Sequence, residues 1–202
     1  MKIKTLSAVL VSAVALSTNS TSRAGDFHFP VGITYADGIN KVWDGLEKVY
    51  AADGFTIEKS FVLPVGLSIN PYYDIGNGLA IGLDFGPVAI IAVDQVGAGS
   101  STVDYSFIIP VGADVRYTFL KDKDVSPYVR AGVRLPIVTG NIVDSSTAGV
   151  FGVVGIDFWR QNNVGMSFEV GYDTSKVTVK GPIAAKESVK FPGLTVSLCV
   201  RF

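Results

Sequence analysis

Few residues of this chain have the types and spacing that catalysis requires. His28 is the only histidine and Cys199 is the only cysteine among the 202 residues. A serine–histidine–acid site would have to use His28, and the sequence shows no recognisable version of such a site. A lone cysteine cannot form an intramolecular disulfide or a cysteine-based metal cluster, and no phosphate-binding glycine motif is present. We therefore expect no enzymatic activity, no bound metal and no cofactor.

A larger group of charged residues recurs at alternate positions of otherwise apolar segments. Its acids are Asp84, Asp104, Asp114, Asp157, Glu169 and Asp173, and its bases are Arg116, Arg130, Arg134 and Arg201. Alternate residues of a strand share one face, so these charges would lie together on that face, with glycines between them. There they could pair as a lumen charge network or line a thin aqueous path.

The elements that would hold these charges are strands. Eight segments have apolar residues on one parity, and their charged residues and many of their glycines fall on the other. They span residues 27–35, 61–69, 79–91 with a break at Pro87, 105–119, 129–137, 150–158, 164–172 and 194–202. None of the positions on the apolar parity is charged. Each segment is therefore predicted to be a strand with one fully apolar face.

The connections between these strands alternate in length. Short polar turns occupy residues 75–78, 121–124 and 160–163, whereas the long connections are 37–57, 94–102, 140–148 and 174–190. Short and long connections alternate in this way in an up-and-down antiparallel barrel, whose short turns lie at one end and whose long loops lie at the other. The predicted fold is therefore all-β, an eight-stranded antiparallel up-and-down barrel.

Composition decides which face of the barrel points outward. The chain is 48% hydrophobic and 17% charged, with a mean hydropathy of +0.39. The interior of an eight-stranded barrel is too narrow for the bulky apolar set, so that set must face outward, into lipid. Aromatic residues near the strand ends and aliphatic residues in the middle agree with a transmembrane barrel. The net charge of −1 disfavours a nucleic-acid partner.

The first residues are predicted to be a secretory signal peptide. Lys2 and Lys4 precede an apolar run over residues 6–16, and small residues follow up to Ala24. This run is too short to span a bilayer as a helix. We expect cleavage after Ala24, which leaves residues 25–202 as a single barrel domain.

The first long connection has a helical pattern. Apolar residues recur every three or four positions, at Ile39, Val42, Trp43, Leu46, Val49 and Tyr50. This predicts one short amphipathic helix that ends near Gly54. Its apolar stripe could pack as a cap on the barrel mouth, or Trp43 and Tyr50 could contact lipopolysaccharide or a partner. The cap is the preferred interpretation because such stripes are usually core.

Prolines interrupt several of the predicted strands. Pro30, Pro64, Pro110 and Pro136 each lie inside an alternating segment. Proline removes a ladder hydrogen bond, so we expect bulges or bends near one rim, with each proline facing inward.

At this level of pattern, residues 25–202 resemble the small bacterial outer-membrane barrels of the OmpA, OmpX and OmpW type. The closing residues look like the C-terminal assembly signature of such proteins: Leu194, Val196, Leu198, Val200 and Phe202. The resemblance implies the outer membrane of a Gram-negative bacterium. It also implies contact with outer-membrane lipid, lipopolysaccharide and the barrel-assembly machinery, and we expect a monomer.

Three functions remain open at this point. The first is a structural or surface-interaction role through the long extracellular loops, with a lumen filled by salt bridges. The second is a passive channel for small or hydrophobic solutes. The third is a lipid-modifying enzyme, which would have to use His28.

Overall fold

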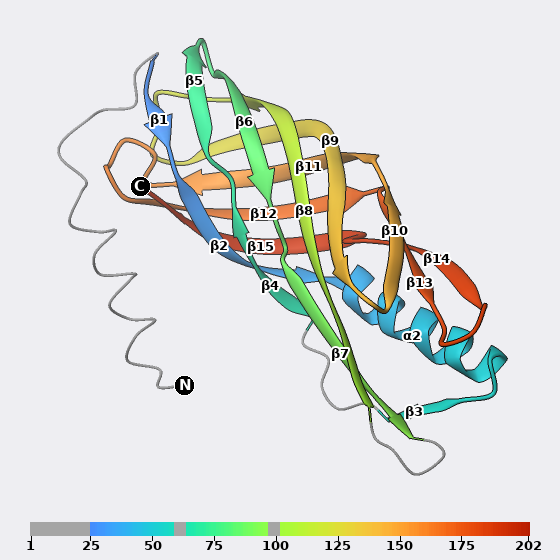
Figure 1. The fold of residues 1–202 in the computed structure, drawn as a ribbon. Helices are drawn as coiled ribbons and strands as arrows, with labels where there is room; N and C mark the ends of the chain where they lie inside the picture. The colour runs from blue at the N-terminus through green and yellow to red at the C-terminus, as the bar shows by residue number, and fades with distance from the viewer. Residues whose placement is uncertain (1–24, 59–63, 97–101) are drawn as a thin grey trace.

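The computed structural model describes residues 25–58, 64–96 and 102–202, so the predicted leader lies outside the described residues. Strands dominate, with one helix near the start (Figure 1). The elements are β1 (Phe27–His28), β2 (Pro30–Ala36), α2 (Asp37–Ala52), β3 (Thr56–Glu58), β4 (Val65–Ile69), β5 (Tyr72–Gly76), β6 (Leu79–Phe85), β7 (Ala89–Val96), β8 (Thr102–Thr118), β9 (Ser126–Gly140), β10 (Val143–Thr147), β11 (Gly149–Phe158), β12 (Gly165–Asp173), β13 (Lys176–Lys180), β14 (Lys186–Lys190) and β15 (Leu194–Arg201).

The strands close into an antiparallel barrel, as predicted. The ring runs β2, β4, β6, β8, β9, β11, β12 and β15, and β15 pairs with β2 to complete it. At the closing pair, Gly32 lies opposite Cys199. A Cβ at position 32 would collide with the Cys199 side chain, so the close approach requires glycine. Two of the predicted strands are each divided, into β1 with β2 and β6 with β7, and β5 forms in residues to which no strand was assigned.

The outer surface of the barrel is apolar, and the half of its interior toward the short turns is polar. Ile33, Leu83 and Leu198 are at least half exposed, whereas their strand neighbours Thr34, Asp84 and Cys199 are buried. An outward apolar band of this extent matches a transmembrane barrel. Exposed aromatic residues gather at both ends of the band: Phe27, Phe29, Tyr73, Tyr117, Phe119, Phe158 and Trp159 at one end, and Tyr35, Tyr105, Phe107 and Tyr172 at the other.

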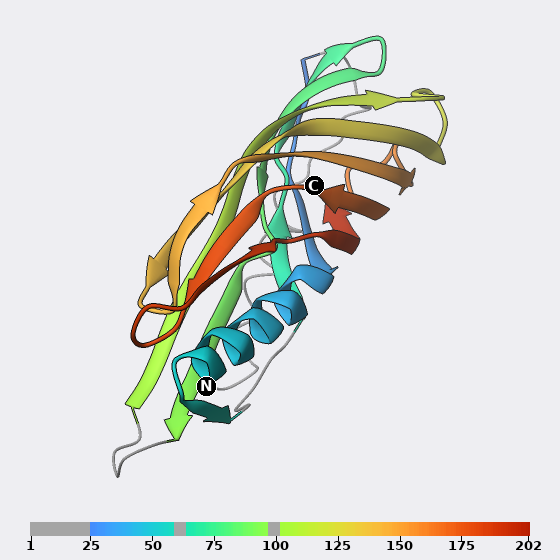
Figure 2. The same cartoon turned by 90° about the vertical axis from the view of Figure 1, so that its right-hand side faces the viewer.

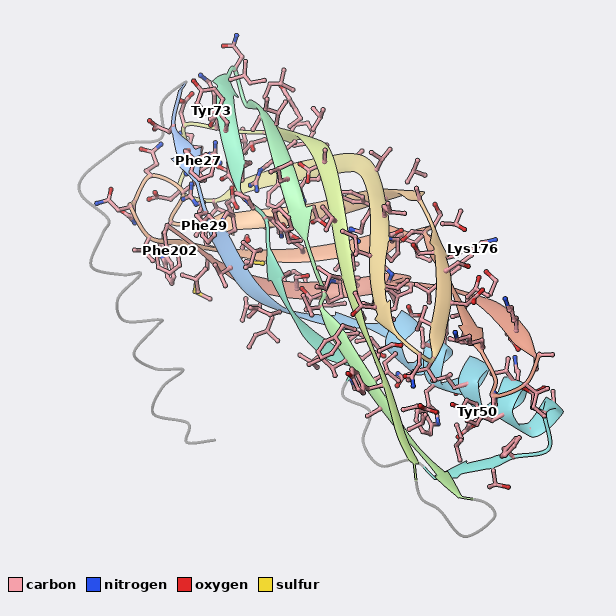
Figure 3. The ribbon with its side chains drawn as sticks, viewed as in Figure 1. Phe27, Phe29, Tyr50, Tyr73, Lys176 and Phe202 are labelled. Carbon is pink, nitrogen blue, oxygen red and sulfur yellow. The ribbon has the colours of Figure 1, made fainter. Side chains whose placement is uncertain are left out.

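The two ends of the barrel differ. The turn end contains the short turns and the residue Phe202, whose carbonyl oxygen accepts a hydrogen bond from the Phe29 N–H at 3.1 Å. The opposite, loop end contains α2 and the long connections (Figure 1). Figure 3 shows Phe29 and Phe202 together at the turn end, while Lys176 and Tyr50 lie at the loop end.

Three of the predicted long connections contain additional strands. Residues 143–147, 176–180 and 186–190 form a separate antiparallel sheet in the order β10-β13-β14, which extends from the loop end of the barrel. In addition, β3 pairs with the far end of β7, with Thr56 opposite Val96. These extra strands are only three to five residues long.

The prediction that the four prolines form bulges near one rim is wrong, because Pro30 begins β2 at the turn end and Pro64 precedes β4 at the loop end. Pro110 lies directly opposite Pro136 in the middle of the β8–β9 ladder, and the register continues through this pair without a shift. Neither residue can donate a ladder hydrogen bond. The Pro110 carbonyl accepts from the Gly86 N–H at 3.1 Å, so the backbone of Pro110 faces the β6 side and its missing donor concerns that neighbour. The neighbouring ladders are interrupted at this level, because β6 ends opposite Val111 and β11 begins opposite Arg134.

The predicted helix is present as α2, and its apolar stripe is buried. α2 packs mainly against β14 and β13, beside the loop half of the barrel (Figure 2). Trp43, Leu46 and Tyr50 are at most 2% exposed. No helix in the described residues has the length and apolar character needed to cross a membrane.

Candidate functional site

The centre of the lumen contains a network of buried ion pairs around Arg130. Its guanidinium donates to Asp84 at 3.1 Å, to Asp114 at 3.0 Å and to Glu169 at 3.1 Å. These side chains come from β6, β8, β9 and β12, and all are buried. Tyr128 also donates its hydroxyl to Glu169. Inward-facing charges of both signs therefore satisfy one another where water is scarce.

A second arginine extends this network toward the loop end. Arg134 donates to Asp84 through Nε at 2.7 Å and to Asp173 through Nη1 at 2.6 Å. The guanidinium carbon lies 4.3 Å from the centroid of the Phe151 ring, so the cation also contacts an aromatic face. Asp173 is held in turn by the Ser175 hydroxyl, which donates to it at 2.7 Å.

A third cluster lies toward the turn end. Asp157 accepts from Arg116 and from Arg160, and Arg160 also donates to Asp74 at 3.1 Å. The Arg116 guanidinium lies 3.5 Å from the centroid of the Tyr128 ring. Arg201 donates to the backbone carbonyl of Arg160 at 2.9 Å, which ties the last strand to the 159–160 turn.

The structure brings together most of the charged residues that the sequence placed in the lumen and places one of them elsewhere. Those that line the lumen are Asp84, Asp114, Arg116, Arg130, Arg134, Asp157, Glu169, Asp173 and Arg201. Asp104 lies apart, near the loop end, where Asn141 and Tyr50 donate to it. Sequence reasoning missed Asp74 and Arg160, because it treated Arg160 as part of a polar turn and assigned no strand to Asp74.

Little space remains between these side chains. A cavity of about 10 Å³ lies beside the network, with Ser68, Arg130 and Ser197 among its lining residues. That is room for about one water molecule. The charged half of the lumen is therefore filled by its own side chains at this level.

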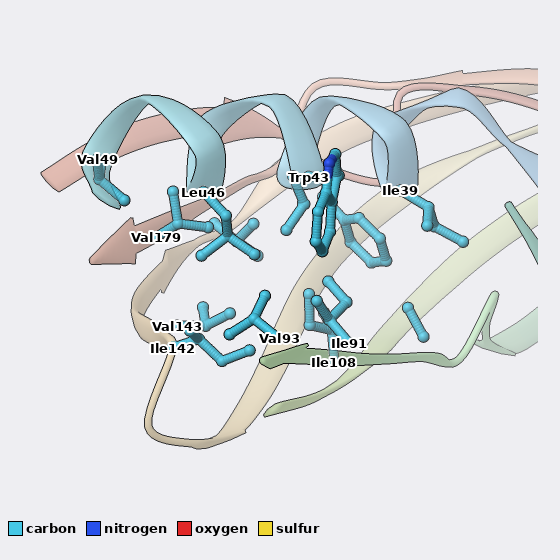
Figure 4. Packing of buried hydrophobic residues seen from close by; sticks show 14 of the residues in the cluster. Ile39, Trp43, Leu46, Val49, Ile91, Val93, Ile108, Ile142, Val143 and Val179 are labelled. Carbon is cyan, nitrogen blue, oxygen red and sulfur yellow. The ribbon is translucent and has the colours of Figure 1, made fainter. Parts of the chain in front are cut away.

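The loop half of the interior is apolar. Ile91, Val93 and Ile108 point inward from β7 and β8 and meet the stripe of α2 (Figure 4). Ala36, Ala89, Ile142, Val143, Val177, Val179 and Phe191 complete this buried cluster, which we call the apolar chamber and whose space is taken up by its own closely packed side chains. Trp43, Leu46 and Tyr50 lie within it. Trp43 and Tyr50 are turned away from the surface and cannot be the lipopolysaccharide contacts that one interpretation of the sequence allowed.

Polar contacts fix α2 at both ends. At its start, Asp37 accepts a hydrogen bond from the Leu194 N–H at 2.7 Å. Just after its end, the Asp53 carboxylate accepts from the N–H groups of Ile183 at 2.9 Å, Ala185 at 3.1 Å and Ala184 at 3.2 Å. The hydrogen bond from Ile183 is the main cause that lowers the pKa of Asp53 below its ordinary value. Lys48 pairs with Glu187 at 2.9 Å.

Within the described residues, the shortest pairing in the barrel ring is the one between β4 and β6. The register between β4 and β6 consists of the single pair Ile69 and Phe85. Beyond it, Val88 donates to the Leu67 carbonyl at 3.2 Å. Within the described residues, β7 then pairs with β8 along one edge and with β3 only at residues 94–96 along the other. We call this boundary the β4–β7 seam.

His28 and Cys199 are both buried. The His28 ring lies 4.7 Å, centroid to centroid, from the Tyr72 ring at the turn end of the lumen. Cys199 faces inward from β15 and is 1% exposed.

A closed eight-stranded barrel with an outward apolar band and a charged interior defines the class of small outer-membrane β-barrels. Two solved structures share this architecture. One is the outer membrane protein OprG from Pseudomonas aeruginosa, with a TM-score of 0.56 and 15% identity over 90% of this chain and 98% of that chain. The other is the outer membrane protein AlkL in DMPC lipid bilayers, with a TM-score of 0.52 and 14% identity over 92% of each chain.

These likenesses confirm the predicted fold class, and they extend over nearly the whole of both neighbours. No family model matches the chain, and no curated protein matches it.

Proposed function

We propose that the protein passes small apolar molecules from the cell surface into the outer membrane. The observation that carries this proposal is the apolar chamber. A lipid-embedded barrel normally has a polar interior, whereas here residues 89–93 of β7 are apolar on both faces. Ile90 points outward and is 66% exposed, and its neighbour Ile91 is buried in the chamber.

The chamber is a suitable place for an apolar solute. Burial of apolar surface is favourable by about 25 cal/mol per Å², and the inner faces of β7, β8 and β13 provide such surface. In the closed state α2 covers this surface itself. The polar contacts at Asp37, Asp53 and Lys48 hold the helix in place. Movement of α2 would expose the chamber without breaking the barrel ladder.

The charged network determines the direction of transfer in this proposal. Arg130 and Arg134 with their carboxylates fill the lumen below the chamber, so an apolar solute has no favourable path toward the turn end. The proposal places a sideways exit at the β4–β7 seam, because few backbone hydrogen bonds join its two sides among residues 64–96. The solute would then enter the hydrocarbon region directly.

Uptake by intact cells tests the proposal. The probe is 1-N-phenylnaphthylamine, which fluoresces on entering an apolar environment. Cells that produce the protein should take it up faster than cells without it, and Asp53→Ala, which frees the end of α2, should increase the rate further. The matched control is Asp122→Ala, in the exposed turn at the other end. Uptake equal to that of cells without the protein would contradict the proposal.

A single-tryptophan variant locates the solute. The chain has two tryptophans, and Trp159 is exposed at the turn end while Trp43 is buried in the chamber. In Trp159→Phe, quenching of the remaining fluorescence by 1-bromooctane should report entry into the chamber. If the quenching of Trp43 equals that of free tryptophan in micelles without protein, the result would contradict occupancy of the apolar chamber by the solute.

A structural or surface-interaction role is the second candidate. The β10-β13-β14 sheet favours it, since this sheet presents an ordered polar face outside the barrel. This role would be favoured over transfer if two results were obtained together. Phenylnaphthylamine uptake in all variants would equal that of cells with the unmodified protein, and deletion of the gene would impair the integrity of the envelope.

A further inference from the structure

The outer face of the β13–β14 hairpin carries four lysines. In the ladder, Lys176 lies opposite Lys190 and Lys180 lies opposite Lys186, with Thr178 opposite Ser188 between them. Directly opposed residues share one face of an antiparallel pair. The alternate pairs, Val177 with Val189 and Val179 with Glu187, face α2 on the other side. All four ammonium groups therefore belong to the face that points away from the barrel core.

Within the structure this arrangement is unfavourable. Like charges directly opposite each other destabilise a strand pair, and here the same conflict occurs twice in five residues. Asp144 relieves one of the pairs, because it accepts a salt bridge from Lys186 at 2.8 Å. In the described part of the chain Lys176 has no ion pair or side-chain hydrogen bond. The Lys176–Lys190 pair thus lacks a compensating acid on this face.

The position of the pair relative to the membrane indicates what compensates it. Tyr172 belongs to the exposed aromatic residues at the loop end, and such residues lie at the headgroup level. The Lys190 Nζ donates to the Tyr172 hydroxyl at 2.9 Å and lies 5.4 Å from the centroid of its ring. Its ammonium group is therefore at the headgroup level too. Figure 3 shows Lys176 on the outside of the barrel at this end.

The surroundings of the lysines suit a phosphorylated sugar. Exposed hydroxyl groups accompany them on the outer face: Ser145 and Thr147 on β10 and Ser188 on β14. Hydroxyls can donate to and accept from sugar oxygens, while ammonium groups bind phosphate as point charges. A neutral or purely hydrocarbon lipid would not use either group.

We propose that Lys176 and Lys190 bind a phosphate of the glycolipid headgroup in the outer leaflet, with the hydroxyls of the same face against its sugars. Lys180 and Lys186 lie four residues further out, about 13 Å along the strands, and would meet anionic groups above the first phosphate. The hairpin would anchor the loop end of the barrel to the lipid around it. This surface is independent of the apolar chamber.

Binding of purified lipid A to the folded protein tests the proposal. Bisphosphorylated lipid A should bind, and removal of its phosphates should weaken binding while the acyl chains stay the same. In Lys176→Gln/Lys190→Gln the apparent affinity for the bisphosphorylated form should fall roughly 30-fold, since each lysine near an anionic surface contributes about a factor of five. Lys176→Arg/Lys190→Arg keeps both charges and should retain binding.

Lys121→Gln/Lys123→Gln is the matched control, because it removes two lysines from the turn end and should leave binding unchanged. Heat-dependent gel mobility verifies that every variant is folded. Equal affinity for phosphorylated and dephosphorylated lipid A would overturn the proposal, as would an equal loss in the control pair. Competition by millimolar inorganic phosphate as strong as that by lipid A would show a free-anion site and would overturn the assignment to lipid.

Discussion

Asp84 and Arg134 form an ion pair across an intervening strand. In the register, Asp84 on β6 lies opposite Gly112 on β8, and Gly112 lies opposite Arg134 on β9. The two charged side chains meet above Gly112, which has no side chain, and Arg134 Nε lies 2.7 Å from an Asp84 oxygen. Charge and glycine thus alternate around the lumen for a steric reason: a narrow interior can hold long ionic side chains only where neighbouring positions are empty.

Gly112 should therefore be intolerant of even a methyl group. A Cβ at this position would lie 2.5 Å from the Val133 carbonyl oxygen, which is backbone and cannot move away. Gly112→Ala should cost about 1–3 kcal/mol of unfolding free energy, as overpacking usually does. Gly152→Ala is the control, because a Cβ there would have no atom within 4 Å. Urea unfolding in detergent, followed by gel mobility, measures both. Equal stability of the two variants would refute the steric explanation.

Arg130 should be the most sensitive charge in the lumen. It binds Asp84, Asp114 and Glu169, so Arg130→Gln leaves Asp114 and Glu169 buried without their cation, while Asp84 keeps Arg134. Loss of one partner from a buried ion pair costs about 3–5 kcal/mol. Lys123→Gln in the exposed 120–124 turn should change the unfolding free energy by less than about 0.5 kcal/mol. If both variants unfold at the same urea concentration, the network does not stabilise the barrel.

The barrel could be predicted from the sequence because its signal is repeated. Each strand has the same alternation of apolar and polar residues. In a narrow barrel the apolar residues, such as Leu83 and Val133, must face lipid. The stripe of α2 was equally readable, since residues from Ile39 to Tyr50 repeat every three or four positions. Both patterns extend over enough residues to exclude other periods.

Shorter or non-local features could not be predicted in this way. β13 and β14 have five residues each, and the lysines at both ends of each strand are more typical of a loop than of a strand. Pro110 and Pro136 were expected at a rim, but they face each other in mid-ladder because of interruptions in neighbouring strands. The apolar chamber depends on the inward turn of α2 over β7 and β8, which is a tertiary contact without a local signal.

Leu83 tests the orientation of the two faces of the barrel. It points outward from β6, is half exposed and lies opposite Ala113, between the aromatic residues of the two ends. Leu83→Arg should cost about 2–4 kcal/mol if this site is near the bilayer midplane. Ile183→Arg, at an exposed position in the β13–β14 connection, should be nearly neutral. The measurement is reversible unfolding in lipid vesicles, and a neutral Leu83→Arg would reverse the assignment of inside and outside.

The filled lumen predicts how the protein behaves in a planar bilayer. Ion pairs around Arg130 and Arg134 cross the lumen, and the pocket that these arginines help to line has a volume of about 10 Å³. The purified protein should therefore show no discrete single-channel steps. Arg134→Ala, which removes a long side chain from this layer, should produce measurable steps if it remains folded. Steps of defined size in the unmodified protein would mean that ions bypass the network.

Asp53 makes the attachment between α2 and the hairpin dependent on pH. The backbone N–H of Ile183, with those of Ala185 and Ala184, donates to the ionised carboxylate, and this lowers the pKa of Asp53 below its ordinary value of 3.8. A group with a lowered pKa stabilises the folded state above its unfolded pKa, and that stabilisation is lost as the pH falls through the folded pKa. The attachment should therefore persist at neutral pH and weaken only below pH 3.8.

The amide resonances of Ile183 and Ala185 report this change directly. Their chemical shifts should titrate together with a midpoint below 3.8, because both groups bind the same carboxylate. In Asp53→Asn the acid-dependent change should disappear, and hydrogen exchange at both amides should be faster at neutral pH. A midpoint at or above 3.8, or a titration that survives in Asp53→Asn, would show that another acid controls the contact between α2 and the hairpin.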